Sequence, residues 1–325
     1  MKIKVGLFGA GDIADLHASG IKNCSSAELV GLFDIDYQKA QQKSDNFNCR
    51  LYDSAESMLS DPAIDAVFIL TPLEEHFECS IKALQAGKHV LVEKPVSSNV
   101  DEIQQIREAA DKAGKLCVPV HNYLYEDSII RTKELIDSGK LGDIVTIYIL
   151  YNIHHPETVA QRYPGVIRQI LTHHSYITCF LGGPPKSAMA MSSIINDGSV
   201  EKENLALSIL ELENGGLAHF QASFAADDHA SDNWTFTIKV IGTKGSTRFS
   251  HADWVQNQRA IVHSHTYSAY HYSIQNTSRY FIEECLGNGK APLSNLQDAI
   301  ISQRTIEAIE QSIQTGSLQQ IVNPS

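Results

Sequence analysis

The sequence has no apolar run near the roughly 18 residues that a membrane-spanning helix needs, which argues against an integral membrane protein. It also has no low-complexity segment and no internal repeat, which argues against a fibrous or solenoid protein. Its start, Met1–Gly6, leads directly into a predicted strand, so we expect no signal peptide. What remains is an ordinary globular composition, with 43% hydrophobic and 20% charged residues over 325 positions, long enough for two domains.

Positive charge and paired cysteines are also scarce. The formal net charge of −12 argues against nucleic acid as a partner. The cysteines show no spacing typical of a metal site, and they stand singly at positions 24, 49, 79, 117, 179 and 285. Scattered cysteines of this kind predict reduced thiols and a cytoplasmic protein.

A glycine-rich motif follows the first predicted strand, Lys2–Phe8. It has the form G-x-G-x-x-A and consists of Gly9, Ala10, Gly11, Asp12, Ile13 and Ala14. The first glycine permits a tight turn, the second lets backbone approach a pyrophosphate, and the small third residue brings the next helix close to the strand. The amino end of that helix offers N–H groups to phosphates. The segment therefore predicts a dinucleotide-binding βαβ unit, against the alternative of a purely structural one.

An acidic residue after the second predicted strand bears on the choice of cofactor. Asp34 stands 23 residues after Gly11, near the spacing of about 20 expected for a carboxylate that binds the adenine ribose. It would repel a 2′-phosphate, and Ile35 follows it where an arginine could have favoured NADP. We therefore predict NAD over NADP. Asp36 would take the role of Asp34 if the strand ended two residues later.

Strands and helices continue to alternate up to about residue 120, which predicts a doubly wound parallel sheet of the Rossmann type. One buried strand ends at Thr71-Pro72, with His76 near the start of the next helix. Another, Lys88–Glu93, runs into Lys94 and Pro95. Ligands in such sheets bind beyond the carboxyl ends of the strands. Lys94 is therefore expected either at a cofactor site or, alternatively, at the surface as a lysine that closes a strand.

The second part of the chain has a different pattern. Long segments of period two predict an open, mainly antiparallel sheet, with strands at 143–151, 186–195, 205–213, 216–224, 234–241 and 246–249. Asn214-Gly215-Gly216 marks a hairpin. We predict an α/β protein with a dinucleotide-binding domain at 1–121 and a substrate and oligomerisation domain at 122–325. The open sheet would be covered in a homodimer or homotetramer.

These pieces together resemble the Gfo/Idh/MocA family of NAD(P)-dependent oxidoreductases. The resemblance covers nearly the whole chain and is carried by motifs in a fixed order, namely Gly9–Ala14, Thr71-Pro72 with His76, Glu93-Lys94-Pro95, Gly242–Ser246, and Asp298-Ala299 with Ser312 and Gly316. It implies that Lys94 hydrogen-bonds the reacting hydroxyl and takes part in proton transfer. It also implies a cis bond between Lys94 and Pro95. Burial would lower the pKa of such a lysine towards neutrality, where it can act as a base.

The family's second motif, G-G-G-x-L-x-D-x-x-x-H, is altered here. Aligned on Gly165 and Gly183, it places His173 at the histidine and Gln169 at the aspartate, with His174 as the alternative to His173. Glutamine can hydrogen-bond a hydroxyl but cannot titrate. Leu124 replaces the arginine of many relatives.

The residue patterns and the resemblance together give two sets of expected site residues. Those expected at the cofactor are Gly9, Ala10, Gly11, Asp12, Ile13, Asp34, Thr71, Pro72, His76, Glu93, Lys94 and Asn122. Those expected at the substrate are Lys94, Tyr123, Arg168, Gln169, His173 and His174, with Lys94 and His173 catalytic.

Two polar clusters leave alternatives open. His154-His155-Pro156, with Arg162 and Arg168 nearby, is either a pocket edge that holds an anionic group or a solvated loop. The segment from His251 to His271 holds four histidines, but no acidic or cysteine partner is in register with them. We therefore expect no metal and favour a polar lid over a sugar.

The leading functional hypothesis is hydride transfer between a nicotinamide cofactor and a hydroxyl- or keto-bearing carbon of a sugar, sugar derivative or cyclitol. Two alternatives stay open. One is NAD-assisted elimination or glycoside hydrolysis without net redox change, and the other is a cofactor-loaded sugar sensor without turnover.

Overall fold

The structure, a computed structural model, describes residues 2–155, 157–161, 163–195, 201–226, 234–250, 254–256, 261–263 and 267–323. It has two compact units. The first comprises Met1–Tyr125 and His271–Ile300, and the second comprises Glu126–Tyr270 and Ile301–Ser325. The chain therefore returns to the first unit late, whereas the sequence-based division at residue 121 had placed all that follows in the second domain.

The first unit holds a six-stranded parallel sheet in the order β3-β2-β1-β4-β5-β6. Its strands are β1 (Ile3–Phe8), β2 (Ala27–Phe33), β3 (Arg50–Leu51), β4 (Ala66–Ile69), β5 (His89–Val92) and β6 (Cys117–Pro119). The order reverses between β1 and β4, the position at which dinucleotides bind in doubly wound sheets. The predicted Rossmann architecture is confirmed.

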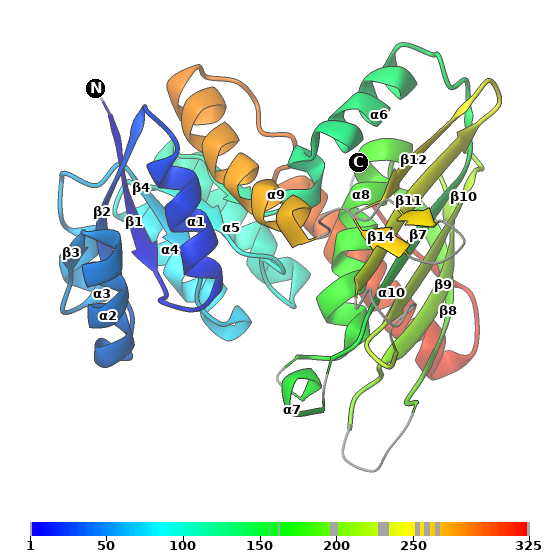
Figure 1. The fold of residues 1–325 in the computed structure, drawn as a ribbon, viewed down its shortest axis with the longest axis horizontal. Helices are drawn as coiled ribbons and strands as arrows, with labels where there is room; N and C mark the ends of the chain where they lie inside the picture. The colour runs from blue at the N-terminus through cyan, green and yellow to red at the C-terminus, as the bar shows by residue number, and fades with distance from the viewer. Residues whose placement is uncertain are drawn as a thin grey trace. The chain divides into compact units, whose positions relative to one another are not determined.

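Helices connect these strands (Figure 1). They are α1 (Ile13–Lys22), α2 (Tyr37–Phe47), α3 (Ala55–Leu59), η1 (Leu73–Glu75), α4 (His76–Gln85), α5 (Val100–Ala113) and η2 (Asn122–Tyr125). The sequence analysis did not anticipate α2. That helix buries only Ala40, Ser44 and Phe47, so its apolar stripe is too thin to be recognised.

The late return of the chain supplies α9 (Tyr267–Arg279) and the π-helical η4 (Tyr280–Gly287). From His271 onwards these helices belong to the first unit, where α9 lies beside α1 (Figure 1). The approach is close at Gly20, because a Cβ there would come within 3.0 Å of Gln275 Cα. The aromatic rings of Phe68 and Phe281 meet edge to face, with centroids 5.8 Å apart. The returning segment thus completes the core of the cofactor-binding unit.

The second unit is built on a seven-stranded mixed sheet in the order β12-β11-β7-β10-β9-β8-β15. Its strands are β7 (Ile144–Ile153), β8 (Pro185–Ser193), β9 (Leu205–Leu212), β10 (Leu217–Ser223), β11 (Trp234–Gly242), β12 (Ser246–Ser250) and β15 (Gln319–Gln320). A separate pair is formed by β13 (Trp254–Gln256) and β14 (Ile261–His263). All pairs of the large sheet are antiparallel except β7 with β10, so the predicted mainly antiparallel sheet is confirmed.

Helices of the second unit gather on one side of this sheet (Figure 1). They are α6 (Asp127–Asp137), α7 (Glu157–Ala160), the π-helical η3 (Ile167–Leu171), α8 (Thr172–Gly182) and α10 (Leu296–Thr315), whose first residues up to Ile300 belong to the first unit. Within the described ranges, no helix is long and apolar enough to cross a membrane.

The opposite face of the sheet carries exposed apolar side chains in two cross-strand rows. The register aligns Met189, Ile209, His219 and Tyr148 in one row, and Met191, Leu207, Gln221 and Leu150 in the next. Ile209 is 54% exposed and Met191 75% exposed. Alternate residues of the same strands, such as Leu210 and Phe220, are fully buried on the helix side.

Candidate active site

The glycine-rich motif forms the turn between β1 and α1. Gly9 has φ +106°, and a Cβ there would come within 2.6 Å of the Leu70 carbonyl oxygen, so only glycine fits. Nothing lies within 4 Å of a Cβ built on Gly11. The turn therefore leaves open space at the amino end of α1, where backbone N–H groups can meet a pyrophosphate. Asp12 caps this helix by position and Ile13 is its first residue.

Asp34 follows β2 and ties two backbone amides. Its Oδ2 accepts from the Ala10 amide at 2.6 Å, and its Oδ1 accepts from the Asp36 amide at 2.8 Å. Asp36 is itself engaged as the N-cap of α2, accepting from Lys39 N. Asp34 thus links the end of β2 to the glycine-rich turn. The geometry favours Asp34 over Asp36 as the acid at the cofactor.

His76 connects two loops at the carboxyl edge of the sheet. Its Nδ1 lies 2.8 Å from the Pro95 carbonyl oxygen and its Nε2 lies 2.9 Å from the Thr71 carbonyl oxygen. The ring is buried, and both nitrogens are engaged by the protein. Pro72 lies in the same loop, directly before η1. A contribution of His76 to cofactor binding would therefore act through the loops it joins, and it stays a prediction.

Lys94 stands directly beyond the carboxyl end of β5. Burial lowers its pKa to about 8, and the neighbouring Glu93 carboxylate opposes that shift. Glu93 Oε2 also accepts from the Lys94 amide at 3.0 Å. The bond between Lys94 and Pro95 is cis, as the resemblance implied. A lysine with this pKa exists in both its charged and its neutral form near neutral pH, as a proton-transfer group requires.

Two further predicted residues lie at the end of β6. The Asn122 amide donates to Ser273 Oγ of α9 at 2.7 Å, and Tyr123 is fully buried. Both therefore help to join η2 to the core of the first unit. Their expected contacts with cofactor and substrate stay predictions.

His121, which the sequence analysis did not select, lies beside this group. Its Nδ1 lies 2.7 Å from Ser294 Oγ, and burial together with the Lys94 charge lowers its pKa to about 3. His121 is therefore neutral at physiological pH and adds no positive charge near Lys94. His121 is the second residue after β6, as Lys94 is the second residue after β5, and that signal could have identified it.

In the second unit, the altered motif spans η3 and the start of α8. Gln169 lies in the π-helical turn and is partly buried, while His173 is buried in the first turn of α8. His173 Nδ1 lies 2.7 Å from the Tyr176 hydroxyl, which orients the ring. Short π-helical segments are frequent at functional sites. The expected roles of Gln169 and His173 are untested by these contacts.

Two neighbours of this motif are engaged elsewhere. His174 is fully buried against Phe220 and Phe236, and burial lowers its pKa to about 3, so it belongs to the core beneath the sheet. Arg168 makes a two-pronged contact with Glu310 of α10, with Nε–Oε1 at 2.6 Å and Nη2–Oε2 at 2.9 Å. The geometry therefore favours His173 over His174, and it gives Arg168 a carboxylate partner within the protein.

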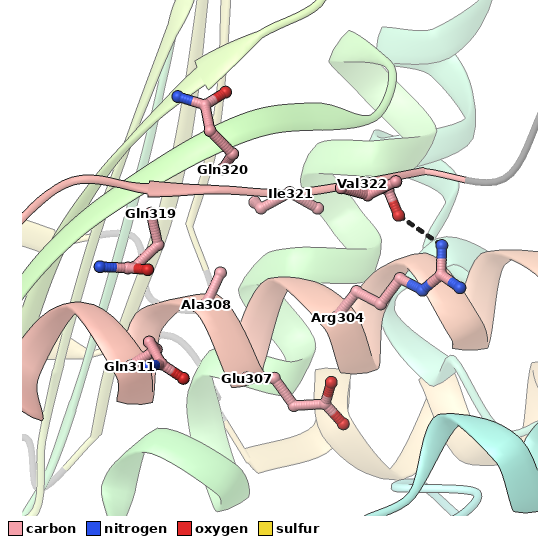
Figure 2. Close-up of a pocket in the computed structure, with 8 residues that line it drawn as sticks. All are labelled: Arg304, Glu307, Ala308, Gln311, Gln319, Gln320, Ile321 and Val322. Atoms are coloured by element: carbon pink, nitrogen blue, oxygen red, sulfur yellow. Dashed lines mark hydrogen bonds between the residues drawn. The ribbon is translucent and has the colours of Figure 1, made fainter.

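The remaining predicted clusters are only partly described. Pro156, Arg162, His251 and His265 lie outside the described residues. The ring of His155 packs on Phe224 and Tyr163. A hollow of about 310 Å³ between α10 and β15 contains none of the predicted site residues, and Arg304 crosses it to donate to the Val322 carbonyl (Figure 2).

Comparison with known proteins gives a consistent result for both units. Residues 3–121 match the family described as "Oxidoreductase family, NAD-binding Rossmann fold", and residues 129–248 match the GFO/IDH/MocA C-terminal domain. The open turn at Gly11 and the free amino end of α1 fit the NAD cofactor of this fold.

Several characterised proteins are similar to this chain. Scyllo-inositol 2-dehydrogenase (NADP(+)) IolW of Bacillus subtilis strain 168 is 31% identical over 65% of this chain, and glucose-6-phosphate 3-dehydrogenase of the same organism is 30% identical over 45%. The aligned parts span 61% and 41% of those two relatives. Scyllo-inositol 2-dehydrogenase (NAD(+)) of the same strain is 24% identical over 97% of this chain and 95% of its own.

The fold is also shared with solved structures. Scyllo-inositol dehydrogenase from Lactobacillus casei, solved with NAD(H) and scyllo-inositol, superposes with a TM-score of 0.88 at 19% identity, covering 99% of both chains.

Proposed function

Because this chain belongs to the Gfo/Idh/MocA family of oxidoreductases, we propose that it is an NAD-dependent dehydrogenase or reductase acting on a hydroxyl- or keto-bearing carbon of a sugar, sugar derivative or cyclitol. The substrate class is supported by the inositol and sugar-phosphate dehydrogenases among its relatives. The observation that carries the proposal is Lys94, placed beyond the carboxyl end of β5 with a pKa of about 8.

The chain's own residues supply binding and proton transfer. The turn at Gly9–Gly11 and the carboxylate of Asp34 would hold the cofactor, which when bound accepts or supplies the hydride. In the oxidation direction, neutral Lys94 accepts the proton of the substrate hydroxyl. In the reduction direction, its ammonium returns that proton. Because His121 is neutral, it adds no charge that would shift the protonation equilibrium of Lys94, whereas the Glu93 carboxylate does.

The second unit would supply hydrogen bonds to the substrate. We assign His173 to a substrate hydroxyl, because Tyr176 fixes the ring through Nδ1. Gln169 would bind a further hydroxyl through its amide, without taking part in proton transfer. Arg168 is excluded from this proposal, since its guanidinium is neutralised by Glu310.

Turnover with a defined substrate panel tests the proposal. The purified protein is incubated with NAD and, in turn, myo-inositol, scyllo-inositol, glucose and glucose 6-phosphate, and formation of NADH is followed at 340 nm. Lys94→Ala should reduce the rate by about 10²–10⁴-fold, the usual contribution of a general base, while leaving NAD affinity intact. A Lys94→Ala variant that keeps most of its rate would contradict the assigned role.

The same set of candidate substrates separates the two alternative functions. Product formation without net NADH would favour NAD-assisted elimination or hydrolysis. Tight binding of a sugar in the presence of NAD, detected by thermal shift but without turnover, would favour a sensor. Either result would replace the dehydrogenase proposal.

We further propose that the protein works in the cytoplasm as a homodimer or homotetramer, covering the exposed rows of the second unit with a second copy. One of these rows holds Met189, Ile209 and Tyr148, whose side chains are exposed on the same face of the sheet. The six cysteines are free thiols, in keeping with a reducing compartment.

A further inference from the structure

A buried histidine of α1 lies directly behind the Glu93 carboxylate. His17 is fully buried, and its Nε2 lies 3.1 Å from Glu93 Oε1. Its Nδ1 lies 2.9 Å from Ser278 Oγ of α9. The ring packs edge to face against Phe68 of β4, with centroids 5.6 Å apart. Three elements of the first unit therefore hold this imidazole in place.

The donor and acceptor capacities of the two side chains determine which of His17 and Glu93 donates the hydrogen bond. An ionised carboxylate can only accept, so His17 Nε2 must carry a proton and donate it to Glu93 Oε1. On the other side of the ring, Ser278 Oγ can serve Nδ1 as acceptor, because its own proton is donated to the Ile274 carbonyl at 3.2 Å. Glu93 Oε2 accepts from the Lys94 amide. Both carboxylate oxygens are thereby fixed by the protein.

We propose that His17 is a positioning residue for Lys94: it holds and partly neutralises the Glu93 carboxylate, which in turn sets how tightly Lys94 keeps its proton. This inference builds on the proposed proton-transfer role of Lys94 and adds a residue that touches neither substrate nor cofactor. It is carried by the path Ser278–His17–Glu93, which fixes the Glu93 carboxylate beside Lys94, with the Lys94 backbone amide as donor to its second oxygen.

The charges in this path determine whether replacing His17 raises or lowers the pKa of Lys94. Glu93 is the charged neighbour that raises the pKa of Lys94, against the effect of burial, and the nearby His121 is neutral. The neighbours of His17 from α9 and β4, Ser278 and Phe68, carry no charge. Removing the Nε2–H donor leaves more negative charge on Glu93. The Lys94 ammonium is then stabilised, and its proton is lost at higher pH.

The test measures the ionisation of Lys94 directly and does not require a substrate. Trace acetylation with acetic anhydride is carried out from pH 6 to 11, and the labelled peptides are quantified by mass spectrometry relative to exposed Lys112. The wild-type midpoint for Lys94 is expected near 8. His17→Leu keeps the volume of the ring but removes the donor. It should raise the midpoint by roughly half a unit, less than the one to three units caused by a direct charge contact.

Two variants separate positioning from general damage. His17→Gln restores an N–H donor at the place of Nε2 and should return the midpoint to the wild-type value. His89→Leu makes the same substitution at the opposite end of β5, where the ring accepts from the Leu116 amide, and should leave the Lys94 midpoint unchanged. A midpoint that stays the same or falls in His17→Leu, in protein with native circular dichroism, would overturn the proposal.

A second measurement reports on His17 itself. In protein labelled with ¹⁵N-histidine, the His17 resonances are identified by their loss in His17→Gln. Nε2 should carry the proton that it donates to Glu93, and an unprotonated Nε2 would refute the assigned contact. Both measurements are independent of turnover. If Lys94→Ala were fully active while these results held, the proton-transfer role of Lys94 would fail and the coupling of His17 to Lys94 would stand.

Discussion

His76 Nδ1 lies 2.8 Å from the carbonyl oxygen of Pro95, the residue that directly follows Lys94. The same ring reaches the Thr71 carbonyl with Nε2. The loop after β4 and the loop after β5 are therefore joined by one buried side chain. His76 therefore helps to fix the position of Lys94 through the backbone of Pro95, the next residue in the chain.

Replacing His76 by alanine should destabilise the first unit and disturb Lys94. The part-buried carbonyls of Thr71 and Pro95 would lose the imidazole between them, and each hydrogen bond lost costs about 0.5–1.5 kcal/mol. Urea unfolding measures the loss, and the acetylation midpoint of Lys94 reports its displacement. His154→Ala, at an exposed loop position, is the control and should change neither.

The pH dependence of turnover should follow Lys94. Oxidation needs the neutral amine, so its rate should rise with pH below about 8 and level off above it. Reduction needs the ammonium and should fall over the same range. In Lys94→Arg the group stays charged, and the rise in the oxidation rate should disappear. A pH profile that is unchanged in Lys94→Arg would assign the titration to another group.

Asp34→Ala should weaken NAD binding. Hydrogen bonds to a charged group contribute about 1.5–3 kcal/mol, so the KM for NAD should rise roughly tenfold or more. Loss of the Asp34 carboxylate also removes the acceptor of the Ala10 amide in the glycine-rich turn, and this should weaken NAD binding further. Adding Ile35→Arg should improve NADP in relation to NAD. Steady-state kinetics with both cofactors tests this, and unchanged NAD kinetics in Asp34→Ala would exclude the assigned contact.

Arg168→Met should lower stability but leave substrate KM unchanged, because the guanidinium is bound to Glu310. Both side chains are partly exposed, so we expect a loss of only about 1 kcal/mol. A double-mutant cycle with Glu310→Gln isolates the coupling between the two residues. A large rise in KM for an anionic substrate would instead restore Arg168 to the substrate site.

Charge placed on the exposed rows should prevent assembly. Ile209→Glu and Met189→Glu should convert the oligomer to a monomer in size-exclusion chromatography with light scattering. Val322→Glu introduces the same charge at another exposed apolar position of the second unit and should leave the oligomer intact. A wild-type protein that is already monomeric would contradict the proposed assembly.

Much of this fold could be predicted from local pattern. The glycine-rich motif and the buried strands that end shortly before Thr71 and Lys94 follow from composition and periodicity, which act within one segment. The parallel pairing of β7 with β10 and the return of residues 271–300 to the first unit depend on contacts between distant segments, and no local pattern records them.

The candidate site shows the same division. Lys94 is marked by its place after a buried strand. The engagement of Arg168 by Glu310 could not be foreseen, because the two residues are 142 positions apart and either could as well face solvent. His17 was missed for a related reason. It lies within an amphipathic helix, and its significance depends on Glu93 and Ser278, 76 and 261 positions away.

The late return of the chain has a consequence for synthesis. The cofactor-binding unit is begun first by the ribosome, yet Ser273, Ser278 and Phe281 emerge only after all of residues 126–270. Until then Asn122 lacks its contact with Ser273, His17 lacks its contact with Ser278, and Phe68 lacks its contact with Phe281. Domains usually fold in the order in which they are made. Here the nascent chain must carry an incomplete nucleotide-binding core while residues 126–270 are made.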